Sequence, residues 1–170
     1  MRVQTIILIL ATLSTGIMAG IFFTWSNAVT TGLGRLTDLE YLRAFQAMNR
    51  TILNPAFFLA IFGPAVLLPL SSFMHFKALP DYLFWMLLAA SLLYLGGVIV
   101  VTFAGNIPLN TILDKSALDG FSLEDAKALR ENFENRWNSL NWIRTFCSLG
   151  AFLILIFVCI ETGSSSIKPF

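Results

Sequence analysis

The stretch Arg136-Trp137-Asn138-Ser139-Leu140-Asn141-Trp142-Ile143-Arg144-Thr145 opens the last apolar run of this 170-residue chain. Successive residues of a helix are rotated by about 100°, so Trp137, Asn141 and Arg144 share one face while Leu140 and Ile143 lie on the other. An ionisable side chain close to hydrocarbon persists only where it is paired or lines a polar cavity. This polar face therefore predicts a functional site at the mouth of a membrane-spanning helix.

The composition is that of an integral membrane protein. Hydrophobic residues make up 56% of the sequence and charged residues 12%, whereas soluble domains average about 25% charged residues. The net charge of +1 argues against a nucleic-acid partner, because nucleic-acid binding needs a basic excess on one surface. Cys147 and Cys159 lie about 18 Å apart along one helix. This distance is too long for a disulfide between them, so they do not indicate a redox compartment.

Four apolar runs are long enough to cross about 30 Å of hydrocarbon. They cover residues 3–29, 55–76, 82–104 and 140–160. The first run resembles a signal peptide at its start, but its apolar sequence continues through Phe23, so we interpret it as a retained span. The sequence thus predicts an all-α fold, an integral membrane four-helix bundle formed by residues 1–170 as a single domain.

Four spans place both termini on one side of the membrane and the two long polar segments on the other. The segment Asp38 to Thr51 has an apolar stripe at helical spacing and is expected to be an amphipathic helix at that membrane face. We expect residues 32–51 and 114–135 to form a partly helical cap, because a cleft at this face needs protection from water.

The second span carries its own boundary signals. Asn54 and Pro55 are typical of an N-cap and a first helical residue. Pro64 and Pro69 are expected to bend the span or mark a break, since each removes one backbone hydrogen bond.

Stripes of polar or small residues reach the same membrane face from separate segments. Gly16 and Gly20 predict a seam of close helix packing in the first span, and Asn27 continues the same stripe. A second stripe, with residues at intervals of four, runs from Thr102 to Asp114. We predict that one cavity collects the side chains of Asn27, Asn49, Arg50, Asn106, Asn110, Asn141 and Arg144.

The distribution of cations predicts the orientation. Arg2, Lys77 and Lys168 lie on the side of the termini, and the other eight cations lie on the side of the long segments. The positive-inside rule then places the long segments in the cytoplasm. We expect a multi-pass protein of a bacterial inner membrane.

Four sequence blocks form a set that extends in order over nearly the whole chain. They are GIMAGIFFTWSN (16–27), QAMNRTILNP (46–55), NIPLN (106–110) and RWNSLNWIRT (136–145). Together they resemble the anthrone-oxygenase-like family of small four-helix membrane proteins. Characterised fungal relatives are associated with oxidising the central methylene of a tricyclic anthrone to a quinone. The resemblance therefore implies an oxygenase-like ancestry, and it does not specify an anthrone as the substrate here.

The residues also limit the chemistry. A metal-dependent oxygenase normally shows a His/carboxylate cluster, but the one histidine, His75, lies at the opposite membrane face. No Gly-rich fingerprint follows a strand, as a dinucleotide site would require. We therefore expect no cofactor and no metal. Together with the resemblance, this favours a cofactor-independent oxidation of a small hydrophobic aromatic substrate.

Such a reaction needs a base, donors for an enolate oxygen and an apolar, water-poor slot. The candidate catalytic residues are Arg144, Asn141, Trp137 and Asn106, with Glu134 or Asp114 as the base. The candidate substrate-binding residues are Trp25, Asn27, Asn49, Arg50, Asn110 and Trp142. Arg144 lies about one turn inside the last span, so its counter-charge must come from another segment, with Asp114 the best-placed acid, or from the ligand.

Other interpretations remain open. Asparagines hydrogen-bond across membrane helices, and interfacial Trp and Arg anchor helix ends, without any chemistry. The protein could also be a non-catalytic partner that binds a lipid or a quinone, or assembles as a homo-oligomer or hetero-oligomer. A transporter is disfavoured because the sequence shows no inverted repeat.

Overall fold

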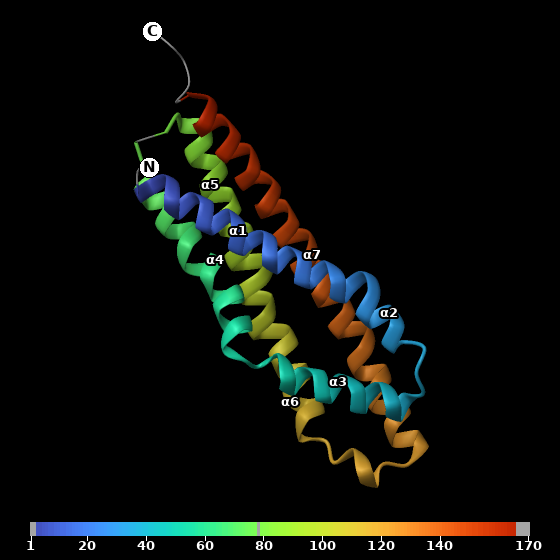
Figure 1. The fold of residues 1–170 in the computed structure, drawn as a ribbon. Helices are drawn as coiled ribbons and strands as arrows, with labels where there is room; N and C mark the ends of the chain where they lie inside the picture. Colours follow the sequence, from blue (N-terminus) through green and yellow to red (C-terminus); the bar gives the residue numbers. More distant parts are fainter. Residues whose placement is uncertain (1–2, 78, 166–170) are drawn as a thin grey trace.

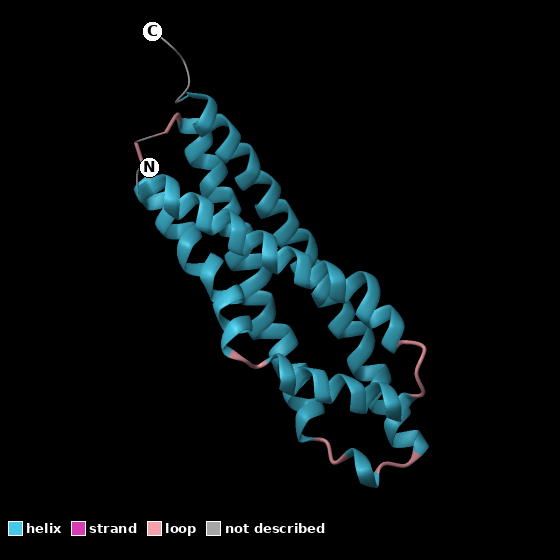
Figure 2. Ribbon diagram, in the orientation of Figure 1, coloured by secondary structure: helices cyan, strands magenta, loops and turns pink. Residues whose placement is uncertain are grey.

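The computed structural model describes residues 3–77 and 79–165 as helices joined by short connections (Figures 1 and 2). The elements in chain order are α1 (Val3–Thr24), η1 (Trp25–Val29), α2 (Thr30–Leu33), α3 (Asp38–Ile52), α4 (Pro55–Met74), α5 (Asp81–Tyr94), η2 (Leu95–Val100), η3 (Thr102–Asn106), α6 (Ile107–Lys115), η4 (Leu118–Gly120) and α7 (Leu123–Ser165). The elements η1, η2 and η3 are π-helical and η4 is a 3₁₀ turn. Within these ranges the fold is all-α, as the sequence predicts.

Four helical stretches are long and apolar enough to cross a membrane. They are Val3–Leu33, Pro55–Met74, Asp81–Lys115 and Leu123–Ser164. The chain is therefore a multi-pass membrane protein. Three of the stretches extend beyond the predicted spans, because α1, α5 and the helix before the last span continue without interruption into the polar side.

The membrane bundle is a ring in which each long helix contacts two others. α1 packs against α4 and α7, and α5 packs against the same two helices. Leu8, Leu68, Leu87 and Leu155 are among the fully buried residues of its core. The start of α1, the end of α7 and the α4–α5 connection lie at one end of the bundle (Figure 1).

Details of two helices differ from the predictions. A Cβ on Gly16 would lie 2.7 Å from the Phe152 ring, which confirms a close-packing seam there, but Gly20 has no such neighbour within 4 Å. Asn54 caps α4 as predicted, since its Oδ1 accepts a hydrogen bond from the Phe57 amide at 3.0 Å. Of the two effects expected at Pro64 and Pro69, a bend or a break, the break is wrong, because α4 runs through both.

The opposite end is a cap formed by α3, α6, η4 and the first turns of α7 (Figure 1). It has its own core, in which Tyr41, Phe45, Leu113 and Phe133 are buried. The cap is thus more than a helix lying flat at the interface: the apolar face of α3 packs on α6 and α7. At the start of α3, hydrogen bonds from the Thr37 hydroxyl and amide hold the pKa of Glu40 below its usual value.

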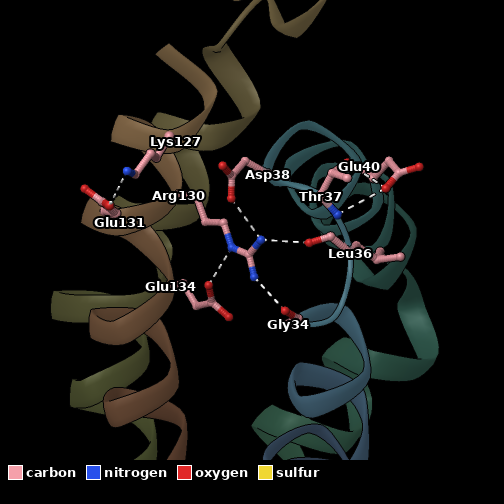
Figure 3. A network of polar contacts seen from close by, with 9 residues as sticks. All are labelled: Gly34, Leu36, Thr37, Asp38, Glu40, Lys127, Arg130, Glu131 and Glu134. Atoms are coloured by element: carbon pink, nitrogen blue, oxygen red, sulfur yellow. Dashed lines mark hydrogen bonds and ion pairs between the residues drawn. The ribbon is translucent and has the colours of Figure 1, made fainter. Parts of the chain in front are cut away.

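Arg130 fastens the α2–α3 connection to α7 (Figure 3). Its guanidinium donates hydrogen bonds to the Gly34 carbonyl at 2.9 Å and the Leu36 carbonyl at 2.8 Å. It also pairs with Glu134 at 2.7 Å and with Asp38 at 3.0 Å. These bonds account for all three nitrogens of the guanidinium, so Arg130 is a structural residue of the cap.

Candidate functional site

A cavity of about 120 Å³ lies beneath the cap, where α1, α3, α4, η3 and α7 meet. An engineered void of about 150 Å³ is large enough to bind benzene. The lining residues are Ile21, Phe22, Trp25, Asn49, Ile52, Leu53, Phe57, Phe58, Ile61, Phe62, Thr102, Phe103, Asn106, Ile107, Asn110, Trp137, Asn141 and Arg144. The cavity is thus apolar over most of its wall, with polar side chains from α3, η3, α6 and α7.

Arg144 is the charged residue of this lining, and its side chain is buried with 5% of the residue exposed. Its Nη2 donates a hydrogen bond to Asn141 Oδ1 at 2.7 Å. Its Cζ lies 4.6 Å from the ring centroid of Phe22 and 5.3 Å from that of Trp137, which are cation–π distances. Over the described ranges no Asp or Glu forms an ion pair with it. The cavity therefore holds a positive charge that no carboxylate of residues 3–77 and 79–165 pairs with.

Asn141 is held so that its carbonyl faces Arg144. Its Nδ2 donates to Ser26 Oγ at 2.7 Å and to the Phe22 carbonyl at 3.2 Å. The hydroxyls of Ser26 and Thr145 are 2.9 Å apart. Because both amide hydrogens are engaged by α1 and η1, the Oδ1 atom is left to accept from the guanidinium.

Aromatic side chains close the cavity on the side of the cap. The ring centroids of Trp25 and Trp137 are 5.4 Å apart, and both rings contact Phe45 at 5.5 and 4.8 Å. Trp137 is fixed further by a hydrogen bond from its Nε1 to Asn110 Oδ1 at 2.8 Å. This arrangement suits a flat apolar ligand, because aromatic faces stack on one another.

Two π-helical segments contribute to the site. η3 supplies the polar lining residues Thr102 and Asn106, and η1 supplies Trp25 together with Ser26, which accepts the hydrogen bond from Asn141. A π-helical turn inserts an extra residue into a helix, and such turns are frequent at functional sites. Neither segment has a sequence signal, and so Ser26 was missed among the candidates and Thr102 was placed only on a stripe.

Four polar side-chain atoms of the lining are buried and have no hydrogen-bond partner in the structure. They are Asn49 Nδ2, Thr102 Oγ1, Asn106 Oδ1 and Arg144 Nε. An unsatisfied buried polar atom typically destabilises a fold by about 1–3 kcal/mol. These four atoms are therefore free to bond to the polar atoms of water or of a bound molecule.

The structure places the two candidate bases outside the cavity. Glu134 pairs with Arg130 in the cap, and Asp114 pairs with Arg50 at 2.6 Å. Asp114 is therefore not the counter-charge of Arg144, which corrects the expectation from the sequence. Helical spacing brought both acids to the right membrane face, but it could not show that a nearer arginine binds each of them.

Three of the candidate substrate-binding residues also lie elsewhere. Arg50 lines an adjoining hollow of about 250 Å³ at the edge of the cap, together with Thr111 and Asp114. This hollow shares Asn49, Leu53, Ile107 and Asn110 with the cavity. Asn27 is exposed and is not part of the lining. Trp142 is 38% exposed and stacks on Phe146 with a centroid distance of 5.3 Å. Of the residues predicted to share one cavity, the structure brings together Asn49, Asn106, Asn110, Asn141 and Arg144. The candidates Trp25 and Trp137 line the same cavity.

The lining does not have the side chains of a metal site. It contains no His, Cys, Asp or Glu, and the residues that the structure describes contain no group of three such side chains that could hold a metal ion. His75 is buried at the other end of the bundle, with its Nδ1 2.8 Å from the Ser71 carbonyl.

A comparison with known proteins identifies the family. Residues 56–154 match the family model described as anthrone oxygenase. No curated protein and no solved structure matches the chain. The matched stretch includes Thr102, Asn106, Trp137, Asn141 and Arg144, and so contains most of the polar lining of the cavity. Because the match covers more than half of the 170 residues, this chain belongs to the anthrone oxygenase family.

Proposed function

We propose that this protein oxidises a small hydrophobic aromatic substrate in the cavity, with Arg144 stabilising the enolate that forms. The observation that supports the proposal is the buried guanidinium of Arg144, which has no carboxylate partner among the described residues and faces an apolar, aromatic wall. An anion formed beside this charge would supply the missing counter-charge. The helical spans suit a bacterial inner membrane, since outer-membrane proteins of bacteria typically span as β-barrels.

The proposed reaction uses dioxygen as the oxidant. A methylene that lies between two aromatic rings, and is conjugated through them with a ketone, loses a proton. The resulting enolate oxygen accepts a hydrogen bond from Arg144. The enolate gives one electron to O₂, and recombination with the reduced oxygen forms a C–O bond and, after protonation, a hydroperoxide. Loss of water from the hydroperoxide leaves a carbonyl. The balance is R₂CH₂ + O₂ → R₂C=O + H₂O.

The proton acceptor in this proposal is water, because the lining offers no carboxylate or imidazole. A positive charge about 4 Å from the enolate oxygen stabilises the anion by about 4 kcal/mol at an effective dielectric constant near 20, which lowers the pKa of the substrate C–H by about three. Asn106 Oδ1 and Thr102 Oγ1, both without a partner, are suited to hold the water.

The test uses Arg144→Lys in proteoliposomes, with anthrone as the substrate and a protein-free control for spontaneous oxidation. We expect the variant to fold and to lose about 100-fold or more in oxygen uptake and anthraquinone formation, because a point ammonium cannot replace the planar fork of donors. Arg144→Leu, which removes the charge, serves as the zero-activity reference. Turnover that is unchanged in Arg144→Lys would refute the catalytic role.

A second candidate is non-catalytic binding of a quinone, a lipid or another protein subunit. The lack of a carboxylate base among the lining residues favours it, and Arg144 and Asn49 would then donate to carbonyl oxygens of the bound molecule. Solvent extraction and mass spectrometry of the purified protein test this function. A stoichiometric quinone or lipid without turnover of anthrone would support it over oxidation.

A further inference from the structure

The exposed residues of the cavity lining are all apolar. Within the described ranges they are Leu53, Phe58, Phe62, Phe103 and Ile107, with exposed fractions between 41 and 64%. The polar lining residues are buried, except Asn110, which is half-buried. A rim of large apolar side chains is unfavourable in water and is favourable against lipid tails. We call this rim the lateral mouth.

Four of the five residues of the lateral mouth belong to helices that could span a membrane, and Leu53 lies in the connection before α4. Phe58 and Phe62 belong to the span Pro55–Met74, and Phe103 and Ile107 to the span Asp81–Lys115. The ring centroids of Phe62 and Phe103 are 6.4 Å apart, so one pair of rings faces across the opening. Behind this pair lies Arg144, whose Nε has no partner.

The cap covers the cavity on the side away from the spans. Phe45, Leu113 and Phe133 are buried in the cap core. Gln46 ties α3 to the end of α6 through a hydrogen bond from its Nε2 to the Leu113 carbonyl at 2.8 Å. At the edge of the cap, the Arg50–Asp114 pair borders the adjoining hollow, which shares Leu53 and Ile107 with the lateral mouth. This hollow is the competing route, from water.

We infer that the ligand enters the cavity sideways through the lateral mouth, from the hydrocarbon region of the bilayer, and that Phe62 and Phe103 control its passage. The inference rests on the proposed binding of an apolar ligand in this cavity. It is supported by the apolar rim and by the place of four of its five residues in candidate spans. An apolar molecule concentrates in the bilayer, so this route delivers it without transfer through water.

The experiment measures the rate at which 1-bromonaphthalene, added in liposomes, quenches the fluorescence of Trp25 and Trp137 in the cavity wall. The parent protein carries Trp85→Phe and Trp142→Phe, which removes the other two tryptophans of the sequence. We expect Ile107→Phe to slow quenching about tenfold by narrowing the mouth, and Phe62→Ala to accelerate it by a similar factor. Stopped-flow mixing with proteoliposomes gives both rates.

Matched controls use the same substitutions on the same helices. Ile112 is exposed on α6 and Phe73 on α4, and neither lines the cavity. Ile112→Phe and Phe73→Ala should leave the rate within about twofold of the parent. Arg50→Gln opens the ion pair at the edge of the cap and should also leave it unchanged.

The outcomes separate the route from the proposed function. Acceleration by Arg50→Gln with no effect of Phe62→Ala would overturn the lateral route, even if the protein oxidises anthrone. Phe62 decides between the routes because it lines the cavity alone, whereas Ile107 also lines the adjoining hollow. Absence of quenching in the parent and in Phe62→Ala would overturn the binding of apolar ligands and the route together. Quenching that follows the mouth variants in a protein without turnover would support the route and refute oxidation.

Discussion

At the scale of single residues, the site depends on how Arg144 is tolerated. A lone cation in the middle of a membrane helix destabilises insertion by roughly 2.5–3.5 kcal/mol. The faces of Phe22 and Trp137 and the amide oxygen of Asn141 offset part of this cost. None of these three groups carries a negative charge, so the guanidinium keeps its electrostatic effect on a ligand.

Asn141→Asp would give Arg144 the counter-charge that it lacks. The new carboxylate would replace an amide oxygen that is 2.7 Å from Nη2. We expect little net change in thermal stability, because the ion pair is gained while the buried hydrogen bond from the amide to the Phe22 carbonyl is lost. Anthrone turnover should fall about 100-fold, because the cavity no longer attracts an enolate. Thermal unfolding and oxygen uptake on the same preparation measure both effects.

Asn135→Asp is the matched control for this prediction, since Asn135 is exposed on the same helix. It introduces the same charge outside the cavity and should change neither quantity. If Asn141→Asp retained full turnover, then the positive charge of Arg144 would not be what stabilises the reacting anion.

The sequence was sufficient to predict which residues of α7 share the face of the site. It was insufficient to predict which cations the nearby acids bind. Trp137, Asn141 and Arg144 are four and three residues apart, and this spacing fixes a common helix face wherever the helix packs. Glu134 shares that face on a helical wheel, but the α2–α3 connection brings Gly34 and Leu36 against Arg130 one turn away, and Glu134 completes that network. Only the tertiary structure shows which cation forms an ion pair with a given acid.

At the scale of elements, π-helical turns shape the site. The third span contains the π-helical segments η2 and η3. The Leu-rich sequence before Gly96 did not predict them, because over a few residues a π-helical turn and an α-helical turn show the same apolar periodicity. η2 also brings the backbone of Gly97 so close to α7 that a Cβ there would overlap the Sγ of Cys147. The close contact between η2 and α7 therefore depends on the absence of a side chain at Gly97.

Gly97→Ala should destabilise the bundle by about 1–3 kcal/mol, because the added methyl group overpacks the contact with Cys147. Gly96→Ala is the matched control, since a Cβ at Gly96 meets no atom within 4 Å, and it should be neutral or slightly stabilising because alanine favours helix. Thermal unfolding in detergent compares the two. Equal stability of both variants would show that η2 and α7 are packed less closely than the position of Gly97 beside Cys147 indicates.

At the scale of the whole molecule, hydropathy predicted the four spans well, since each is an uninterrupted apolar run. The cap was predicted only as a partly helical cover, because its core is formed by contacts between residues far apart in the chain, such as Phe45 with Phe133 and Trp137. The same is true of the lateral mouth: α4 contributes its phenylalanines to the cavity, and an apolar helix gives no sign of which face lines a site.

The structure shows which cations of the cap side are exposed and which are buried in the site or bound in the cap. Of the eight cations on the cap side, Arg144 is buried in the site and Arg130 is held in the cap network. The remaining six are exposed: Arg35, Arg43, Arg50, Lys115, Lys127 and Arg136. Among the residues described at the opposite end, Lys77 is the exposed cation. The bias toward the cap therefore persists after functional and structural cations are set aside.

Because cytoplasmic loops carry the excess of Lys and Arg, we predict that the cap faces the cytoplasm. Asp119→Cys places an exposed thiol in the cap, and Asp81→Cys places one at the start of α5 at the other end. In a background with Cys147→Ala and Cys159→Ala, a membrane-impermeant maleimide added to spheroplasts should label Cys at position 81 at once and Cys at position 119 only after permeabilisation. The reverse pattern would put the cap outside and show that the cations of this surface do not determine the topology.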